Sequence, residues 1–169
     1  VDTLTPDSLA AVSTVLNFER QRSFDFDTDG TNEQIRMHAT GPAWDSMTVV
    51  LHIQNVQGEL LYADTISTER YTGLDPDPAM SREEVGTMIR RELERFLSSQ
   101  SFVSTSENFD DANMDLRANA PWMTDAELDR FREDLMSRPM FRYYIGGESS
   151  IGITWSGVLR KFVQTSSCC

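Results

Sequence analysis

The chain has 169 residues, the size of one ordinary domain and enough to bury a hydrophobic core without disulfide bonds. It carries 27 acidic against 15 basic residues, which gives a formal net charge of −12. This excess argues against a nucleic-acid or anionic-membrane partner, since both select for Lys and Arg patches, and it favours cations or basic protein surfaces. No apolar stretch approaches the ~20 residues that a transmembrane helix needs.

The two ends of the sequence bear on its compartment. The chain starts at Val1 without an initiator methionine, and we expect an exported protein that is periplasmic, lipid-anchored upstream or secreted. Both cysteines, Cys168 and Cys169, are adjacent at the other end, where they cannot brace a fold, and we expect a flexible tail at 165–169. A terminal Cys-Cys pair also resembles the prenylation signal of Rab-type GTPases, but the phosphate-binding G-x-x-x-x-G-K-[ST] run of that class is missing.

The first part of the chain is predicted to form a short helix and then strands. Thr5-Pro6-Asp7 is typical of a helix start, and apolar residues follow it at near-helical spacing: Leu9, Val12, Val15 and Leu16. Apolar and polar residues then alternate over 34–40, 47–54 and 59–66, which is the period of half-buried strands. The last two of these segments predict a β-hairpin.

Two helices with clear start signals are predicted in the second half. Ser81 and Glu84 form a capping-box pattern that opens a helix over about 81–98. Thr124 and Glu127 repeat the pattern, and a second helix over about 124–137 is expected to end before Pro139. The polar run between them predicts a long loop at 98–123, which is either functional or contains an element without a clear sequence signal.

The end of the chain is again strand-like. Strands are expected at about 140–145, 150–155 and 158–164, separated by glycine-containing turns. The elements do not alternate strictly between strand and helix. We therefore expect an α+β fold in one domain spanning 1–169, with an antiparallel sheet of about five to six strands, two main helices and the short N-terminal helix.

The strongest chemical motif is an acidic run between the predicted N-terminal helix and the first strand. It places carboxylates at alternate positions before Gly30 and ends at Glu33. It resembles the D-x-D-x-D-G-x-x-[DE] calcium-binding loop of integrin-type and FG-GAP-like repeats and, over its first half, the loops of EF-hands and dockerins. The resemblance implies Ca²⁺ as a cofactor, with side-chain oxygens from four residues and a main-chain carbonyl from a fifth: Asp25, Asp27, Asp29, Glu33 and Thr31.

An EF-hand itself does not fit this run. Its twelfth position should be a bidentate glutamate but is Arg36, and a strand pattern follows where a helix is needed. The alternative to a calcium site is a bare acidic turn, in which Gly30 supplies a positive φ and the aspartates accept hydrogen bonds from their own backbone. Another metal is a further alternative.

The two histidines raise the question of a zinc site. His38 and His52 both fall on the polar phase of predicted strands, and Asp64 is a candidate third ligand. Zinc needs three or four converging ligands, and the spacing contains neither H-x-H nor H-E-x-x-H. The pattern therefore favours solvent-facing histidines.

Three functional hypotheses follow from these observations. The leading one is an exported, non-enzymatic binding domain for a protein or polymer partner, stiffened by Ca²⁺ at the acidic turn. The second is a metal- or carboxylate-dependent hydrolase, which needs a pocket with two or more carboxylates of raised pKa near 98–121. The third is an inhibitor- or immunity-type protein whose charge steers it to a basic target. No catalytic residue and no oligomeric state follow from the sequence.

Overall fold

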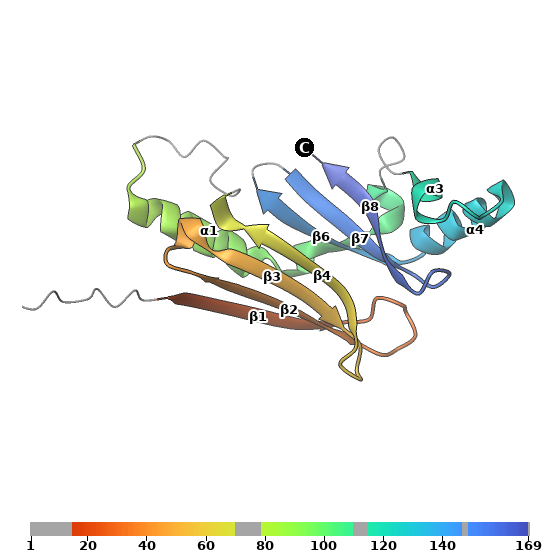
Figure 1. Cartoon of the computed structure of the whole chain (residues 1–169), viewed down its shortest axis with the longest axis horizontal. Helices are drawn as coiled ribbons and strands as arrows, with labels where there is room; N and C mark the ends of the chain where they lie inside the picture. The colour runs from red at the N-terminus through yellow and green to blue at the C-terminus, as the bar shows by residue number, and fades with distance from the viewer. Residues whose placement is uncertain (1–14, 70–78, 110–114, 147–148, 169) are drawn as a thin grey trace, which may run out of the picture.

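The chain forms an α+β structure built on two antiparallel sheets. The computed structural model describes residues 15–69, 79–109, 115–146 and 149–168. Within these residues there are eight strands in two four-stranded sheets, of order β1-β2-β3-β4 and β5-β6-β7-β8 (Figure 1). The first sheet contains β1 (Leu16–Phe24), β2 (Glu33–Gly41), β3 (Thr48–Gln54) and β4 (Leu60–Ser67). The second contains β5 (Phe102–Ser104), β6 (Pro139–Gly146), β7 (Ser149–Ser156) and β8 (Lys161–Cys168).

Helices and 3-10 turns connect these strands. The helices are α1 (Arg82–Arg95), α2 (Thr105–Asn108), α3 (Leu116–Asn119) and α4 (Asp125–Met136), and the 3-10 turns include η1 (Trp44–Ser46) and η3 (Ser99–Ser101). The two predicted main helices are thus confirmed, each slightly shorter than expected. No helix in the described part of the chain is long and apolar enough to cross a membrane.

Both main helices begin as their sequences predict. Ser81 accepts a hydrogen bond from the Glu84 amide at 3.3 Å, and the Glu84 carboxylate accepts one from the Ser81 amide at 2.7 Å. Thr124 and Glu127 make the same pair of bonds at 3.4 and 2.7 Å. An N-cap of this kind stabilises a helix by about 1 kcal/mol. The residues at each helix start therefore determine where the two main helices begin.

The first sheet has one buried face and one polar face. Ile35, Met37 and Ala39 of β2 are fully buried, and they lie opposite three fully buried residues of β3: Ile53, Leu51 and Val49. The alternate residues of β2 are exposed. The period-two patterns predicted strands β2, β3 and β4 correctly because only one side of this sheet is covered.

The expectation of an N-terminal helix followed by a loop was wrong at its described end. Residues 1–14 lie outside the described residues, and Leu16, placed in that helix, begins strand β1. Phe18 and Phe24 lie on the half-buried side of β1, but Arg20 and Arg22 share that side and interrupt its apolar pattern. The Arg22 guanidinium lies 4.6 Å from the Phe102 ring and donates to the Leu97 carbonyl at 3.0 Å, so a charged residue does the packing here.

The last strand is longer and later than the sequence indicated. It starts at Lys161 where Val158 was expected, because residues 157–160 form the turn after β7. It then runs to Cys168, which pairs with Ser150 of β7. Residues 165–168, expected in a flexible tail, are therefore part of a paired strand.

The predicted polar loop at 98–123 contains short elements. In its described residues it forms η3, β5, α2 and α3, while 110–114 lie outside them. β5 pairs with β6 over only three residues, too few for an alternation pattern to be visible in the sequence. This segment makes the edge of the second sheet.

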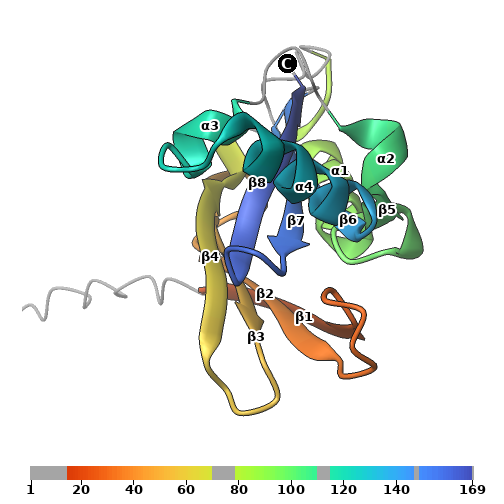
Figure 2. The ribbon, with the colours of Figure 1, turned by 90° about the vertical axis from the view of Figure 1, so that its right-hand side faces the viewer.

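The two sheets stack over one core, and α4 covers the far side of the second sheet (Figures 1 and 2). Two consecutive residues of β8 illustrate this arrangement. Phe162 belongs to the core shared by the two sheets and α1. Val163 packs with Phe131 and Leu135 of α4. Successive residues of a strand point to opposite faces, so the second sheet is covered on both. The single sheet that we expected is thus two sheets joined through aromatic side chains.

Candidate cation site and adjoining groove

Three carboxylates converge in the loop that joins β1 to β2. Ligand oxygens of Asp25, Asp27 and Asp29 lie within 4.8 Å of one another. This is the only group of three or more potential metal ligands among the described residues. The acidic run therefore gathers its aspartates as the sequence indicated.

The same carboxylates also hold the turn together. Asp27 Oδ1 accepts from the Asp29 amide at 3.1 Å, and Asp29 Oδ1 accepts from the Thr31 amide at 2.7 Å. Asp25 Oδ2 accepts from the Gly30 amide at 3.0 Å, with Gly30 at φ +89°. Both features of the bare acidic turn are thus present, the positive φ and the aspartates that cap their own backbone.

One oxygen of this group has no role in the turn. Asp25 Oδ1 is buried and has no hydrogen-bond partner. A buried polar atom without a partner costs about 1–3 kcal/mol relative to one that is hydrogen-bonded. A cation placed among the three aspartates would satisfy this atom.

The remaining two predicted ligands are placed differently. Glu33 begins β2, is only 6% exposed, and its Oε2 accepts from the Phe26 amide at 2.8 Å. It does not belong to the group of three aspartates. Thr31 is exposed at the end of the loop. Glu33 therefore stabilises the loop through a buried hydrogen bond to its backbone.

Phe26 anchors the loop in the core. Its side chain is fully buried, and its ring contacts four other rings: Phe24 at 5.0 Å, Phe102 at 6.1 Å, Phe141 at 6.5 Å and Phe162 at 5.0 Å between centroids. Three of these rings belong to the second sheet. The acidic loop is thereby fixed to both sheets.

A second anchor comes from Arg138, just before β6. Its Nη1 donates to the Asp27 carbonyl, and its Nε donates to Asp134 Oδ1 at 2.9 Å. The contact of Arg138 with Asp27 and those of the Phe26 ring with the second sheet have no local sequence signal, because the two sides of each contact are distant in the chain.

The electrostatics of the loop oppose full ionisation. Burial raises the pKa of Asp27, and the charges of Asp29 and Asp25 add to this effect. Burial also raises the pKa of Glu33, with smaller contributions from Asp27 and Asp25. The pKa of Asp29 is lowered, because its carboxylate accepts the Thr31 amide hydrogen bond. A bound cation would relieve the crowding of negative charge at Asp27 and Glu33.

A groove of about 420 Å³ adjoins the loop. Its lining residues come from the β1–β2 loop, the β3–β4 turn, the end of β7 and the β7–β8 turn, which lie at the same end of the molecule (Figure 1). Asp27, Asp29 and Glu33 form one wall, Glu59 stands in the β3–β4 turn, and Trp155 comes from the end of β7. The sequence did not reveal this groove, since its walls come from segments about 100 residues apart.

The histidines do not form a zinc site with Asp64. His38 and His52 lie on the polar side of the first sheet, and His38 Nε2 is 3.1 Å from Asn17 Oδ1. Asp64 lies opposite buried Leu51 on the other side, where it accepts a hydrogen bond from the Tyr143 hydroxyl at 2.7 Å. The expectation of solvent-facing histidines agrees with this placement.

Comparison with known proteins gives no further constraint. No protein-family model, no curated protein sequence and no solved structure matches the chain. The function must therefore be inferred from the chemistry of the acidic loop and the groove.

Proposed function

We propose that the chain is an exported, non-enzymatic binding domain whose β1–β2 loop takes up Ca²⁺ and thereby stiffens the end of the molecule that meets a protein or polymer partner. The observation that carries the proposal is the convergence of three aspartates, one of which has a buried oxygen without a hydrogen-bond partner. Oxygen-only ligands are typical of a hard cation. Asp25, Asp27 and Asp29 would hold the ion.

Calcium suits this loop better than magnesium. Ca²⁺ accepts irregular arrangements of six to eight oxygens, whereas Mg²⁺ demands a near-ideal octahedron. One oxygen of each aspartate already accepts a hydrogen bond from the amide of Asp29, Gly30 or Thr31. The oxygens that remain for an ion are therefore irregularly arranged. Water and backbone carbonyls would complete the shell.

The exposure of the loop bears on the compartment. Asp29 is exposed, and Asp25 and Asp27 are half-buried, so the loop is a shallow site. Shallow calcium sites in extracellular modules bind at roughly 10⁻⁴–10⁻³ M, and calcium reaches such levels outside the cytoplasm. An affinity in this range would suit the exported location that we propose.

Thermal unfolding tests the proposal. An ion that binds only the folded state stabilises it by about 2.7 kcal/mol at a hundredfold excess over Kd. We expect calcium to raise the Tm, magnesium to raise it less, and Asp27→Asn with Asp29→Asn to abolish the rise. Glu83→Gln with Glu107→Gln removes the same charge elsewhere and should preserve it. Absence of a calcium effect in the unmutated protein would refute the proposal.

The hydrolase is the second candidate, and one observation favours it. Asp27 and Glu33 both have raised pKa values and both line the same groove, although it lies away from 98–121. Against a catalytic role, Glu33 is almost wholly buried and its Oε2 is occupied by the Phe26 amide. Turnover of chromogenic glycosides or esters that is lost in Asp27→Asn and kept in Glu83→Gln would establish the hydrolase instead.

A further inference from the structure

The groove between the three connections has the composition of a site for a basic group. The described residues that line it include three acidic residues that are exposed or half-buried, Asp27, Asp29 and Glu59, and a single basic residue, Arg160. Glu33 also lines it, but its carboxylate is buried and accepts the Phe26 amide hydrogen bond. Its volume of about 420 Å³ can accept one or two long side chains. The charge of its walls is therefore complementary to a cation larger than a metal ion.

Trp155 gives the groove a rigid aromatic wall. Its ring packs edge-on against the Phe162 ring, with centroids 5.4 Å apart and planes at 70°. Phe162 in turn belongs to the core, so the indole is held in place, and Trp155 also lines the groove. Aromatic faces attract guanidinium and ammonium groups, and tryptophan does so most strongly.

The β3–β4 turn, which supplies another part of the lining, is also held in position. The Asn55 side chain donates to Glu59 Oε2 at 3.0 Å and accepts from the Glu59 amide at 2.9 Å, and it accepts from the Gln57 amide at 3.1 Å. These bonds fix the β3–β4 turn and orient the Glu59 carboxylate. A site whose walls are fixed before binding loses less conformational entropy when it is filled.

An exposed apolar side chain also belongs to the lining of the groove. Val56, at the tip of the β3–β4 turn, is 58% exposed. A lone metal ion or polyamine would leave this side chain in water. A polypeptide whose basic side chain enters the groove would cover it as well.

We infer that this groove binds a basic side chain, arginine above all, of an extended segment of a partner protein, with the cation between Trp155 and the carboxylates of Asp27 and Glu59. The inference rests on the binding-domain function proposed above and names the chemical class of its partner. An acidic segment would be repelled by the walls, and a purely apolar one would remove water from the carboxylates of Asp27, Asp29 and Glu59 without compensation. An inhibitor-type role toward a basic target would use this same surface.

A peptide titration tests the inference without calcium. Binding of capped tetra-arginine is compared with that of capped tetra-citrulline, its neutral analogue, by calorimetry at low ionic strength with a chelator present. We expect the arginine peptide to bind and the citrulline peptide not to bind. Equal binding of both peptides would overturn the inference. Because the buffer contains no free calcium, the result does not depend on whether the acidic loop takes up the ion.

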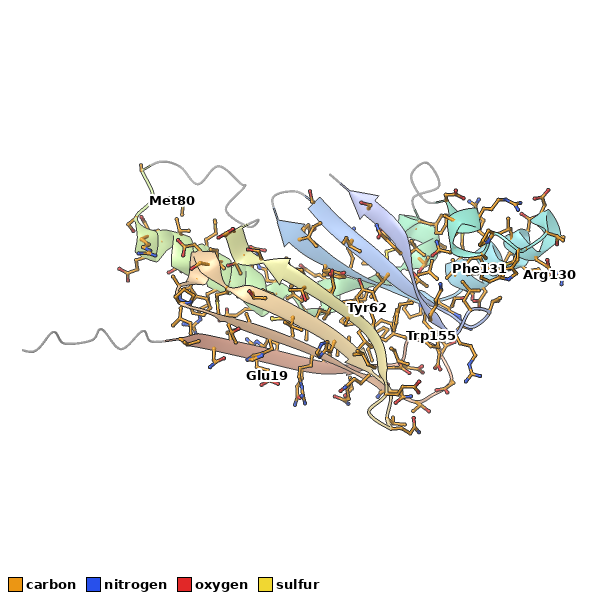
Figure 3. The ribbon with its side chains drawn as sticks, viewed as in Figure 1. Glu19, Tyr62, Met80, Arg130, Phe131 and Trp155 are labelled. Atoms are coloured by element: carbon orange, nitrogen blue, oxygen red, sulfur yellow. The ribbon has the colours of Figure 1, made fainter. Side chains whose placement is uncertain are left out.

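Charge variants separate the groove from general attraction to an acidic protein. We expect Glu59→Gln, which can keep the Asn55 bond, to weaken the arginine peptide roughly two- to fivefold, the effect of one exposed ion pair. Arg160→Gln should strengthen it by a similar factor, and this gain cannot arise from misfolding. Glu83→Gln should change nothing, because Glu83 lies in the first turn of α1, and this helix begins beside Met80 at the end of the molecule opposite Trp155 (Figure 3). Equal weakening by Glu83→Gln, or no gain from Arg160→Gln, would refute a specific site.

Discussion

The two turns at the groove end of the first sheet are held in contrasting ways. The β3–β4 turn is closed by its own Asn55 and Glu59, and its tip residue Val56 is mostly exposed. The β1–β2 loop buries Phe26 completely, and its Asp27 carbonyl accepts a hydrogen bond from Arg138, which lies between α4 and β6. One turn is a local structure and the other joins the two sheets. The β1–β2 loop can carry a charged site without losing its shape, because its contacts with the core and with Arg138 fix its geometry.

The largest expected difference between the two turns comes from truncating their apolar residues. Phe26→Ala removes a ring that contacts four others, and we expect it to lower the free energy of unfolding by about 3–5 kcal/mol. Val56→Ala should change it by less than about 0.5 kcal/mol. Urea denaturation measures both. Similar losses in the two variants would contradict the contrast.

A smaller effect is expected where the turns are alike. Gly30 and Gly58 have φ values of +89° and +82°, and a Cβ at either position would meet nothing within 4 Å. Each Gly→Ala variant should therefore lose only the cost of a left-handed alanine, about 1–2 kcal/mol. If urea denaturation shows equal losses of unfolding free energy in the two variants, the turns differ in how they are anchored and not in backbone strain. A much larger loss at Gly30 would show that the loop tolerates no local change.

The smallest effect is electrostatic and confined to the β1–β2 loop. Because the pKa of Asp27 is raised above 3.8 in the fold, its contribution to stability is fully present below that pH and lost as pH rises through the folded pKa. Asp29 has a lowered pKa, so its contribution is present above 3.8 and lost as pH falls through the folded pKa. In calcium-free buffer at neutral pH, Asp27→Asn should raise the Tm and Asp29→Asn should lower it. Shifts of the same sign would refute this difference.

The sequence predicted the features whose causes are local. Ser81 with Glu84 and Thr124 with Glu127 placed both main helices, since a capping box involves residues three positions apart. The acidic run predicted three converging aspartates for the same reason. Strand β1 was missed because Arg20 and Arg22 occupy its half-buried side, and Arg22 packs by stacking on Phe102.

The sequence could not predict features that depend on distant partners. A period-two pattern shows which face of a strand is buried but not which strand lies beside it, so one sheet was expected where two are stacked. Glu33 was predicted as a metal ligand, and the pattern did not indicate that its carboxylate also accepts the Phe26 amide hydrogen bond. The groove depends on Trp155 and Glu59 meeting the acidic loop, which only the folded chain determines.

Asp27 and Asp29 belong to both the acidic loop and the wall of the groove. If calcium and a basic segment each use these carboxylates, the two ligands are thermodynamically linked: the factor by which one lowers the affinity for the other is the same in both directions. The linkage would make partner binding depend on calcium concentration, because the ion that stiffens the loop also neutralises two carboxylates of the groove wall. A shared pair of side chains is sufficient for such a dependence, without any movement of the sheets.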